Sequence, residues 1–138
     1  MKTEEIIQLA QDIKNKYGEN PIKICTTLKI KINYIDLKPN IYPAYTLKIS
    51  EKPIVNLNSH FTTNSQKVLC AHELGHVLMH DDKLLNQFGD ENNGIEEYEA
   101  NLFAVALLFD QDDLNIDMSN MDNYLLKELL DVNIKLKV

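Results

Sequence analysis

Apolar side chains recur at helical spacing near the start of the chain. In residues 3–17 they follow a period close to that of an α-helix, and the pattern stops before Gly18, which predicts a first helix. Asn20 and Pro21 come next. Because proline fits the first turn of a helix, this pair predicts a short second helix.

Alternation of apolar and polar residues then predicts strands. Residues 30–35 alternate, and residues 45–49 and 53–57 flank the polar residues 50–52, as in a β-hairpin. Residues 132–138 at the end of the chain also alternate, which predicts a terminal strand.

Two longer helical segments contain the most apolar part of the chain. Thr63 and Gln66 have the spacing of a capping box at the start of a helix over residues 65–80. A polar loop over residues 81–93 follows. The next helix, residues 95–109, is almost wholly apolar in its second half, which predicts that it is buried.

The remaining elements complete a predicted α+β fold. Residues 110–122 are predicted to be an acidic connector, and residues 124–130 to form a last helix. Without a linker or repeat, residues 1–138 are predicted to form a single domain. It would have N-terminal helices, a short antiparallel or mixed sheet, and helix 65–80 packed on the buried helix 95–109.

Composition places the chain among ordinary globular proteins. Of its 138 residues, 44% are hydrophobic and 25% are charged. Acidic residues near the start do not fit a signal peptide, and no apolar run approaches the roughly 20 residues of a membrane span. Two cysteines are too few for a secreted disulfide framework. We therefore expect a cytoplasmic protein that does not contact a membrane.

The distribution of charge argues against direct binding of nucleic acid. The net charge is -7, and all 14 basic residues are lysine. Residues 81–122 contain 12 acids and one lysine, a net charge of -11. Nucleic-acid binding requires a basic face, and arginine is the usual reader of guanine and phosphate. The acidic half is instead suited to a basic partner or a cation, or to a solvated surface.

The strongest chemical signal is the sequence His72-Glu73-Leu74-Gly75-His76, an H-E-x-x-H motif. Four residues advance a helix by about 400°, so the two histidines project from the same face and can bind one zinc ion. Glu73 lies on the flank of that face, where it can accept a proton from a water molecule that zinc activates. Gly75 inside a helix costs about 0.8–1 kcal/mol relative to alanine, which suggests close approach of another backbone.

A catalytic zinc site needs a third protein ligand. His80 continues the spacing of the histidines, but it lies roughly 12 Å along the helix from His72, so we expect it to cap the helix C-terminus instead. The acids at the start of the buried helix 95–109 are better candidates for the third ligand, and Glu97 is preferred over Glu96 and Glu99. Asn101 shares a face with Glu97, which suggests that it hydrogen bonds the far nitrogen of a histidine ligand.

Both motifs resemble those of the ImmA/IrrE family of metallopeptidases. The first is Ala-His-Glu-Leu-Gly-His-Val-Leu-Met-His at residues 71–80. The second, at residues 97–108, fits the family pattern E-x-x-A-N-x-F-A-x-x-L-L. The two together, about 20 residues apart, are far more specific than the first alone. Weaker similarity extends the resemblance over most of residues 1–113.

The resemblance implies a small zincin-like domain in which His72, His76 and Glu97 bind Zn²⁺ and Glu73 is the general base. Members of this family are intracellular, and several cut or inactivate helix-turn-helix repressors that control mobile elements or stress responses. The resemblance therefore implies a protein substrate, such as a repressor of this type.

Three functions are compatible with these residues. The first, which we prefer, is a zinc-dependent endopeptidase that cleaves an intracellular regulatory protein. The second is an anti-repressor module that retains the zinc fold but acts by sequestration. The third is a zinc hydrolase of small amides. The presence of Glu73 argues against the second, since a binding module has no need for a base beside the metal.

Overall fold

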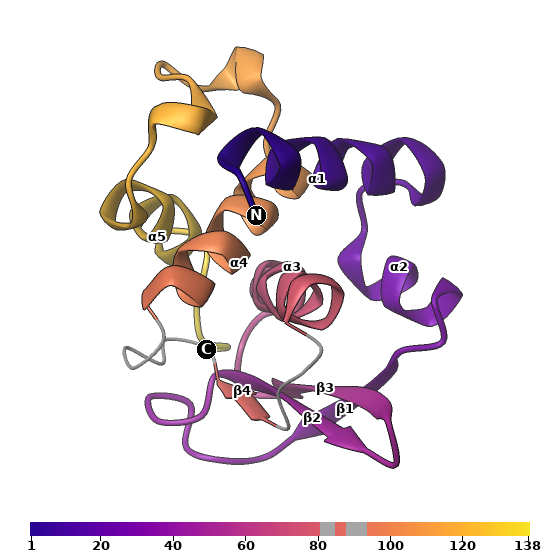
Figure 1. Ribbon diagram of the computed structural model, residues 1–138. Helices are drawn as coiled ribbons and strands as arrows, with labels where there is room; N and C mark the ends of the chain where they lie inside the picture. Colours follow the sequence, from indigo (N-terminus) through magenta and orange to yellow (C-terminus); the bar gives the residue numbers. More distant parts are fainter. Residues whose placement is uncertain (81–84, 88–93) are drawn as a thin grey trace.

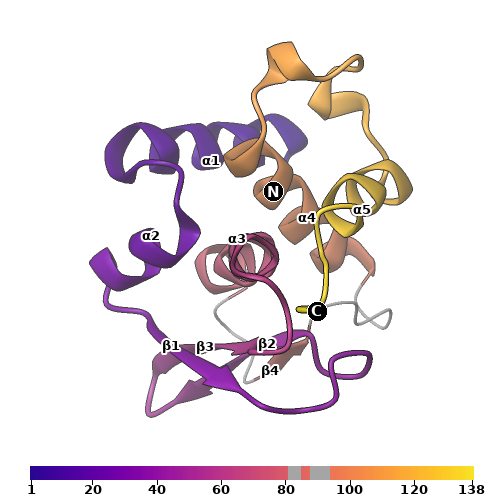
Figure 2. The ribbon, with the colours of Figure 1, turned by 180° about the vertical axis from the view of Figure 1, so that it is seen from behind.

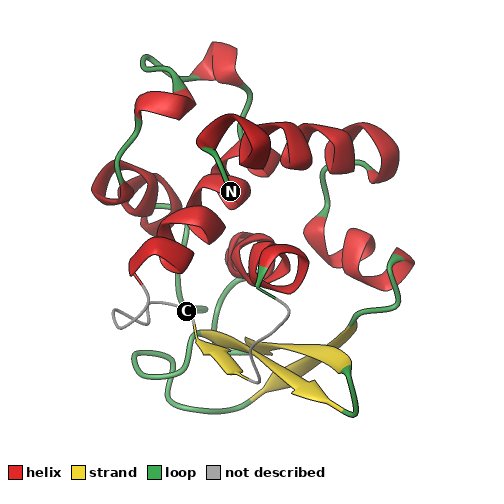
Figure 3. Cartoon of the chain, viewed as in Figure 1, coloured by secondary structure: helices red, strands yellow, loops and turns green. Residues whose placement is uncertain are grey.

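The computed structural model describes residues 1–80, 85–87 and 94–138. Within this part, helices form one layer and a small sheet forms the other, as Figures 1 and 3 show. The central helix, α3 (Thr63–Met79), lies between the sheet and the remaining helices (Figure 1). This arrangement is a mixed α/β fold of the zincin-like type that the sequence predicts.

The predicted helices are all present, with ends set by recognisable caps. Asn20 accepts a hydrogen bond from the Ile22 amide at 3.1 Å at the start of the second helix, and Asp122 caps the last helix in the same way. Besides α3, the α-helices of the described residues are α1 (Thr3–Tyr17), α2 (Pro21–Thr27), α4 (Gly94–Leu108) and α5 (Asn123–Asp131). Within the described ranges, none is long and apolar enough to cross a membrane.

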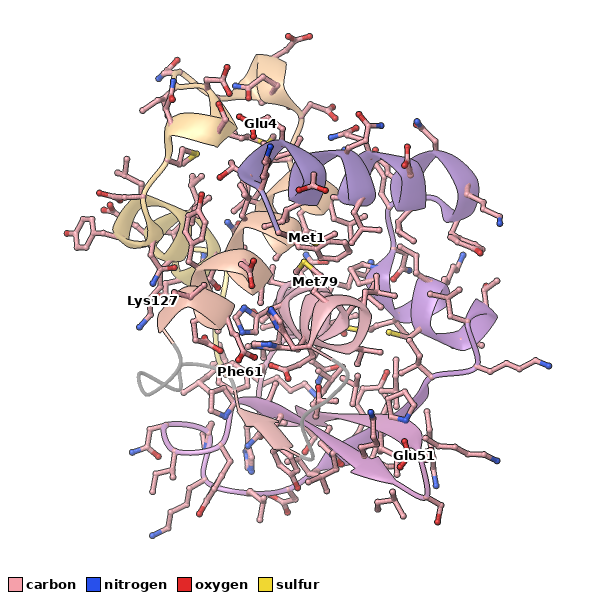
Figure 4. All side chains as sticks on the ribbon, in the orientation of Figure 1. Met1, Glu4, Glu51, Phe61, Met79 and Lys127 are labelled. Atoms are coloured by element: carbon pink, nitrogen blue, oxygen red, sulfur yellow. The ribbon has the colours of Figure 1, made fainter. Side chains whose placement is uncertain are left out.

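The sheet has the strand order β1-β3-β2-β4. Its strands are β1 (Lys31–Ile35), β2 (Ala44–Ile49), β3 (Lys52–Asn58) and β4 (Leu85–Gln87). β2 pairs antiparallel with β3 and β4, whereas β1 pairs parallel with β3, so the sheet is mixed. The predicted hairpin is therefore confirmed, and Figure 4 shows Glu51 at its tip.

Three local predictions are wrong. The N-cap of α3 is Thr62 rather than Thr63, and the Gln66 side chain donates to the Phe61 carbonyl, so the predicted capping box does not form. The segment 81–93 contains β4, which was predicted as loop; its other residues, 81–84 and 88–93, lie outside the described residues. Residues 132–138 do not form a strand.

Instead of a strand, the last residues make a single bridge between Phe61 and Leu136. The Ser65 hydroxyl lies 3.1 Å from the carbonyl oxygens of both Asn133 and Lys135. Figure 2 shows this C-terminal segment beside the beginning of α3. These polar contacts hold the segment against the helix rather than in the sheet.

Helix α3 is buried on nearly all sides, which explains why its chemistry lies inside the fold. It packs on β2 and β3 on one side and on α4 on the other. Every residue from Val68 to His76 is buried. On α4, Phe103 packs against Gly75 of α3 and is fully buried. A helix that is enclosed in this way can keep polar side chains only if they have partners.

Candidate metal centre

The two motif histidines lie side by side on α3. His72 and His76 are one turn apart, and their Nε2 atoms are 3.2 Å from each other. Both side chains are buried. The helical spacing thus brings two ring nitrogens to one point inside the fold.

Glu97 reaches the same point from α4. Its Oε1 lies 2.9 Å from His76 Nε2, and its Oε2 lies 3.3 Å from His72 Nε2. Glu97 is 7% exposed, so water reaches its side chain poorly. The structure therefore brings His72, His76 and Glu97 together, and Figure 4 shows polar side-chain atoms gathered between α3 and α4.

The spacing of these donor atoms fits a tetrahedral metal ion. Nitrogen and oxygen ligands about 2.0–2.1 Å from a tetrahedral ion are separated from each other by about 3.3 Å. The three donor contacts in the site are 2.9, 3.2 and 3.3 Å. Two imidazoles and a carboxylate are also the donor types that such ions prefer. Together, the three buried side chains are compatible with one ion.

The charges in the site without an ion depend on Glu97. Burial would raise the pKa of Glu97, but its hydrogen bonds to His72 and His76 outweigh burial and lower the pKa to about 2. Burial would lower the pKa of His72, but Glu97 and Glu73 raise it overall. For His76 burial prevails, and its pKa is lowered. Glu97 is consequently an ionised carboxylate, which is the form that binds a cation.

The other candidate ligands lie elsewhere. His80 is the C-terminal cap residue of α3, as expected, but its ring contacts other side chains: its Nδ1 is 2.9 Å from His76 Nδ1. The carboxylate of Glu99 is 2.9 Å from His80 Nε2, and that of Glu96 is 3.8 Å from His80 Nδ1. Of the three acids at the start of α4, Glu97 is thus the one between the two motif histidines.

Asn101 lies one turn after Glu97 on α4, close to His72. A side-chain hydrogen bond between His72 and Asn101 is among the causes that raise the pKa of His72. The Asn101 amide nitrogen donates to Asn123 Oδ1 at 2.8 Å, which fixes the orientation of the Asn101 side chain. Asn123 is the first residue of α5, so this contact links a third helix to the site.

Glu73 is buried beside the three donors and has a partner on the sheet. Its Oε1 accepts a hydrogen bond from the Thr46 hydroxyl at 2.8 Å. Its Oε2 has no hydrogen-bond partner among the described residues. Burial raises the pKa of Glu73 to about 7, although His72 and Thr46 oppose that rise. One oxygen is held in place while the other remains available to another group.

The comparison with known families agrees with this geometry. Residues 25–136 match the peptidase family described as the IrrE N-terminal-like domain. The chain belongs to the ImmA/IrrE family. No match was found among curated proteins or solved structures. A metallopeptidase-type domain with a buried site compatible with a metal ion is therefore established for this family member.

Sequence reasoning missed Thr46. Ala44 and Thr46 are the buried positions of β2, and the residue after each of them, Tyr45 and Leu47, is partly exposed. The available signal was therefore a polar residue at a core-facing position of a strand. Its partner depends on how β2 packs against α3, which alternation alone does not specify.

Replacing Thr46 with valine is expected to slow catalysis by about 10-fold without loss of metal. Valine keeps the shape of threonine but removes the hydroxyl that holds Glu73, and a lost partner of a buried charged group costs about 1–3 kcal/mol. Cleavage rates at saturating metal check this. Thr46→Ser, which retains the hydroxyl, should stay near the wild-type rate; equal rates for the valine and serine variants would contradict the role of the hydroxyl.

Gly75 lets α3 and α4 approach closely enough to form the site. A Cβ atom at this position would lie 3.3 Å from the Ala100 Cα and 3.2 Å from the Phe103 ring. Both neighbours are fully buried, so neither can move into solvent. The close approach that the interior glycine suggested is therefore present, one turn from Glu97 on the facing helix.

The Gly75→Ala variant is expected to lose about 1 kcal/mol of unfolding free energy in metal-free protein. Overpacking costs about 1–3 kcal/mol, and the better helix propensity of alanine returns only about 1 kcal/mol. Denaturant unfolding measures the change. Gly94→Ala is the matched control, because a Cβ there would have no neighbour within 4 Å. A Gly75 variant as stable as the wild type would show that the helices can separate without cost.

Proposed function

We propose that the protein is a zinc-dependent endopeptidase. The observation that carries this proposal is the buried cluster of His72, His76 and Glu97 with a second carboxylate, Glu73, beside it. The family supports a metallopeptidase-type domain. A site that only stored or sensed a metal would not need a buried acid with an available oxygen next to the donors.

The division of roles follows from the partners of each side chain. His72 and His76 would hold the ion through Nε2, and Glu97 would hold it through its carboxylate. A zinc ion held by these three side chains would lower the pKa of a bound water molecule and polarise a substrate carbonyl. The fourth ligand position of a catalytic zinc site is left for water or substrate.

Glu73 is suited to move the proton. In the site without an ion, its pKa of about 7 is close to neutral, where a carboxylate can both accept a proton and return it. A cation nearby would lower that pKa, because it stabilises the carboxylate form. Thr46 fixes Oε1, so Oε2 is the oxygen that would receive the proton and then deliver it to the leaving amine.

We further propose that the substrate is an intracellular regulatory protein of the helix-turn-helix repressor type. The family resemblance of the two motifs supports this substrate class. Charge also supports it, since residues 81–122 carry a net charge of -11 and DNA-binding proteins are generally basic. An acidic peptidase would attract the repressor while repelling the DNA itself.

Cleavage of such a repressor tests the proposal. The zinc-loaded protein would be incubated with purified helix-turn-helix repressors, and fragments would be identified by mass spectrometry. We expect cleavage at a defined peptide bond that stops when a chelator removes the metal. Stable complex formation without fragments would instead indicate sequestration. Hydrolysis of small amides with no effect on proteins would indicate the small-substrate hydrolase.

A further inference from the structure

His76 is the start of a chain of hydrogen bonds that leads away from the candidate metal centre. Its Nδ1 lies 2.9 Å from Nδ1 of His80, and Nε2 of His80 lies 2.9 Å from Glu99 Oε1. The other oxygen of Glu99 lies 3.3 Å from the amino group of Met1. His80 is 7% exposed, so its ring is largely shielded from water.

The order of these contacts determines where the protons are. An ionised carboxylate only accepts hydrogen bonds, so the proton of neutral His80 lies on Nε2, facing Glu99. Nδ1 of His80 then has a lone pair and accepts a hydrogen bond from Nδ1 of His76. Neutral His76 therefore carries its proton on Nδ1, and its Nε2 is left with the lone pair that a metal requires.

We propose that His80 and Glu99 are positioning residues that fix the tautomer and the ring orientation of His76 for metal binding. This inference rests on the proposed metal site and adds residues to which neither motif assigns a role. Its physical basis is that a histidine ligand whose other nitrogen donates to a fixed acceptor is held in the binding tautomer and is more basic.

The two histidines of the site are oriented by separate groups. His72 is linked to Asn101, which is held by Asn123 of α5. His76 is linked to His80 and Glu99 instead. Loss of His80 should consequently disturb His76 and leave the surroundings of His72 intact, which gives the proposal a signature that general destabilisation would not produce.

One alternative uses the same atoms. His76, His80 and Glu96 also place donor atoms within 4.8 Å of one another, so they form a second group that is close enough to hold a metal. If both groups held an ion, His76 would bind through both ring nitrogens, without a proton on either. The short contact between the two Nδ1 atoms is explained more simply by one proton between them.

The first test is the protonation of His76 in the full chain. With ¹⁵N-labelled protein, NMR shifts of the ring nitrogens report which one carries a proton, in metal-free and in zinc-loaded samples. We expect His76 Nδ1 to be protonated in both samples, and zinc to shift Nε2. A second zinc ion per chain, or a zinc-loaded His76 without a proton on Nδ1, would overturn the proposal in favour of a second metal site.

The second test is zinc affinity, measured by competition with a chelator. His80→Leu should weaken zinc binding by about 10- to 100-fold. His80→Asn places an oxygen near the position of Nδ1 and should recover part of that loss. The matched control is His60→Leu, because His60 also pairs with a carboxylate, that of Asp36, but on the exposed surface. This control should retain wild-type affinity.

The outcomes separate this inference from the proposed function. If the wild type binds one zinc ion and His80→Leu binds it within about twofold of the wild type, the positioning role is wrong and the peptidase proposal stands. If the wild type binds no zinc, both are wrong. Weakened zinc in His80→Leu, with partial recovery in His80→Asn and unchanged ¹⁵N shifts of His72, supports the positioning role.

Discussion

Replacing Glu73 with glutamine is expected to abolish peptide-bond cleavage while leaving the metal in place. Glutamine has nearly the same shape as glutamate and can still contact Thr46, but it cannot accept a proton from water. General base catalysis contributes about 100- to 10,000-fold to the rate, so the loss should fall in that range. The rate of fragment formation and the zinc content of the same sample measure the two effects.

Glu128→Gln provides the matched control, since it makes the same chemical change at an exposed position of α5. It should cleave at the wild-type rate. A Glu73→Gln variant that remains fully active would show that another group accepts the proton. Loss of zinc together with activity would place Glu73 among the metal ligands instead.

The second large effect is expected for Glu97→Ala, which should weaken zinc binding by more than 100-fold. This substitution removes the donor that joins α4 to the two histidines of α3. Losing a residue that hydrogen bonds a metal ligand weakens metal binding by roughly 10- to 100-fold, and losing the ligand itself should cost more. A ligand at 1,000 times its dissociation constant stabilises a protein by about 4 kcal/mol, so the stabilisation of the wild type by zinc should largely disappear.

Thermal unfolding with and without zinc measures this effect. The control Glu128→Ala should show the same stabilisation by zinc as the wild type. A Glu97→Ala variant that zinc stabilises as strongly as the wild type would mean that another acid completes the site. In that case the nearby Glu96 and Glu99 would be the next residues to replace.

The helices were predictable because their limits are encoded locally. Gly18 ends α1, and Asn20 with Pro21 begins α2, since caps and fixed backbone angles act over a few residues. The strands at the edges were less predictable. Residues 132–138 alternate like a strand but make an isolated bridge, between Leu136 and Phe61, instead of a paired strand. β4 is a three-residue strand in a polar segment, formed by pairing with β2.

In the candidate site, too, the locally encoded features were predictable and those that depend on packing were not. The helical period alone places His72 and His76 together, and the presence of acids in a buried helix indicated Glu97. Thr46 was missed because its contact with Glu73 depends on how a strand packs against α3. The sequence correctly predicted that His80 caps the C-terminus of α3. It did not indicate that the His80 ring contacts Glu99 of α4, which lies 19 residues later.

The metal content of the purified protein tests most directly whether two helices hold one ion between them. After loading with zinc and dialysis, elemental analysis is expected to find one zinc ion per chain in the wild type and almost none in His72→Ala or His76→Ala. Wild-type protein that retains no zinc, or histidine variants that retain as much as the wild type, would contradict a metal centre at His72, His76 and Glu97.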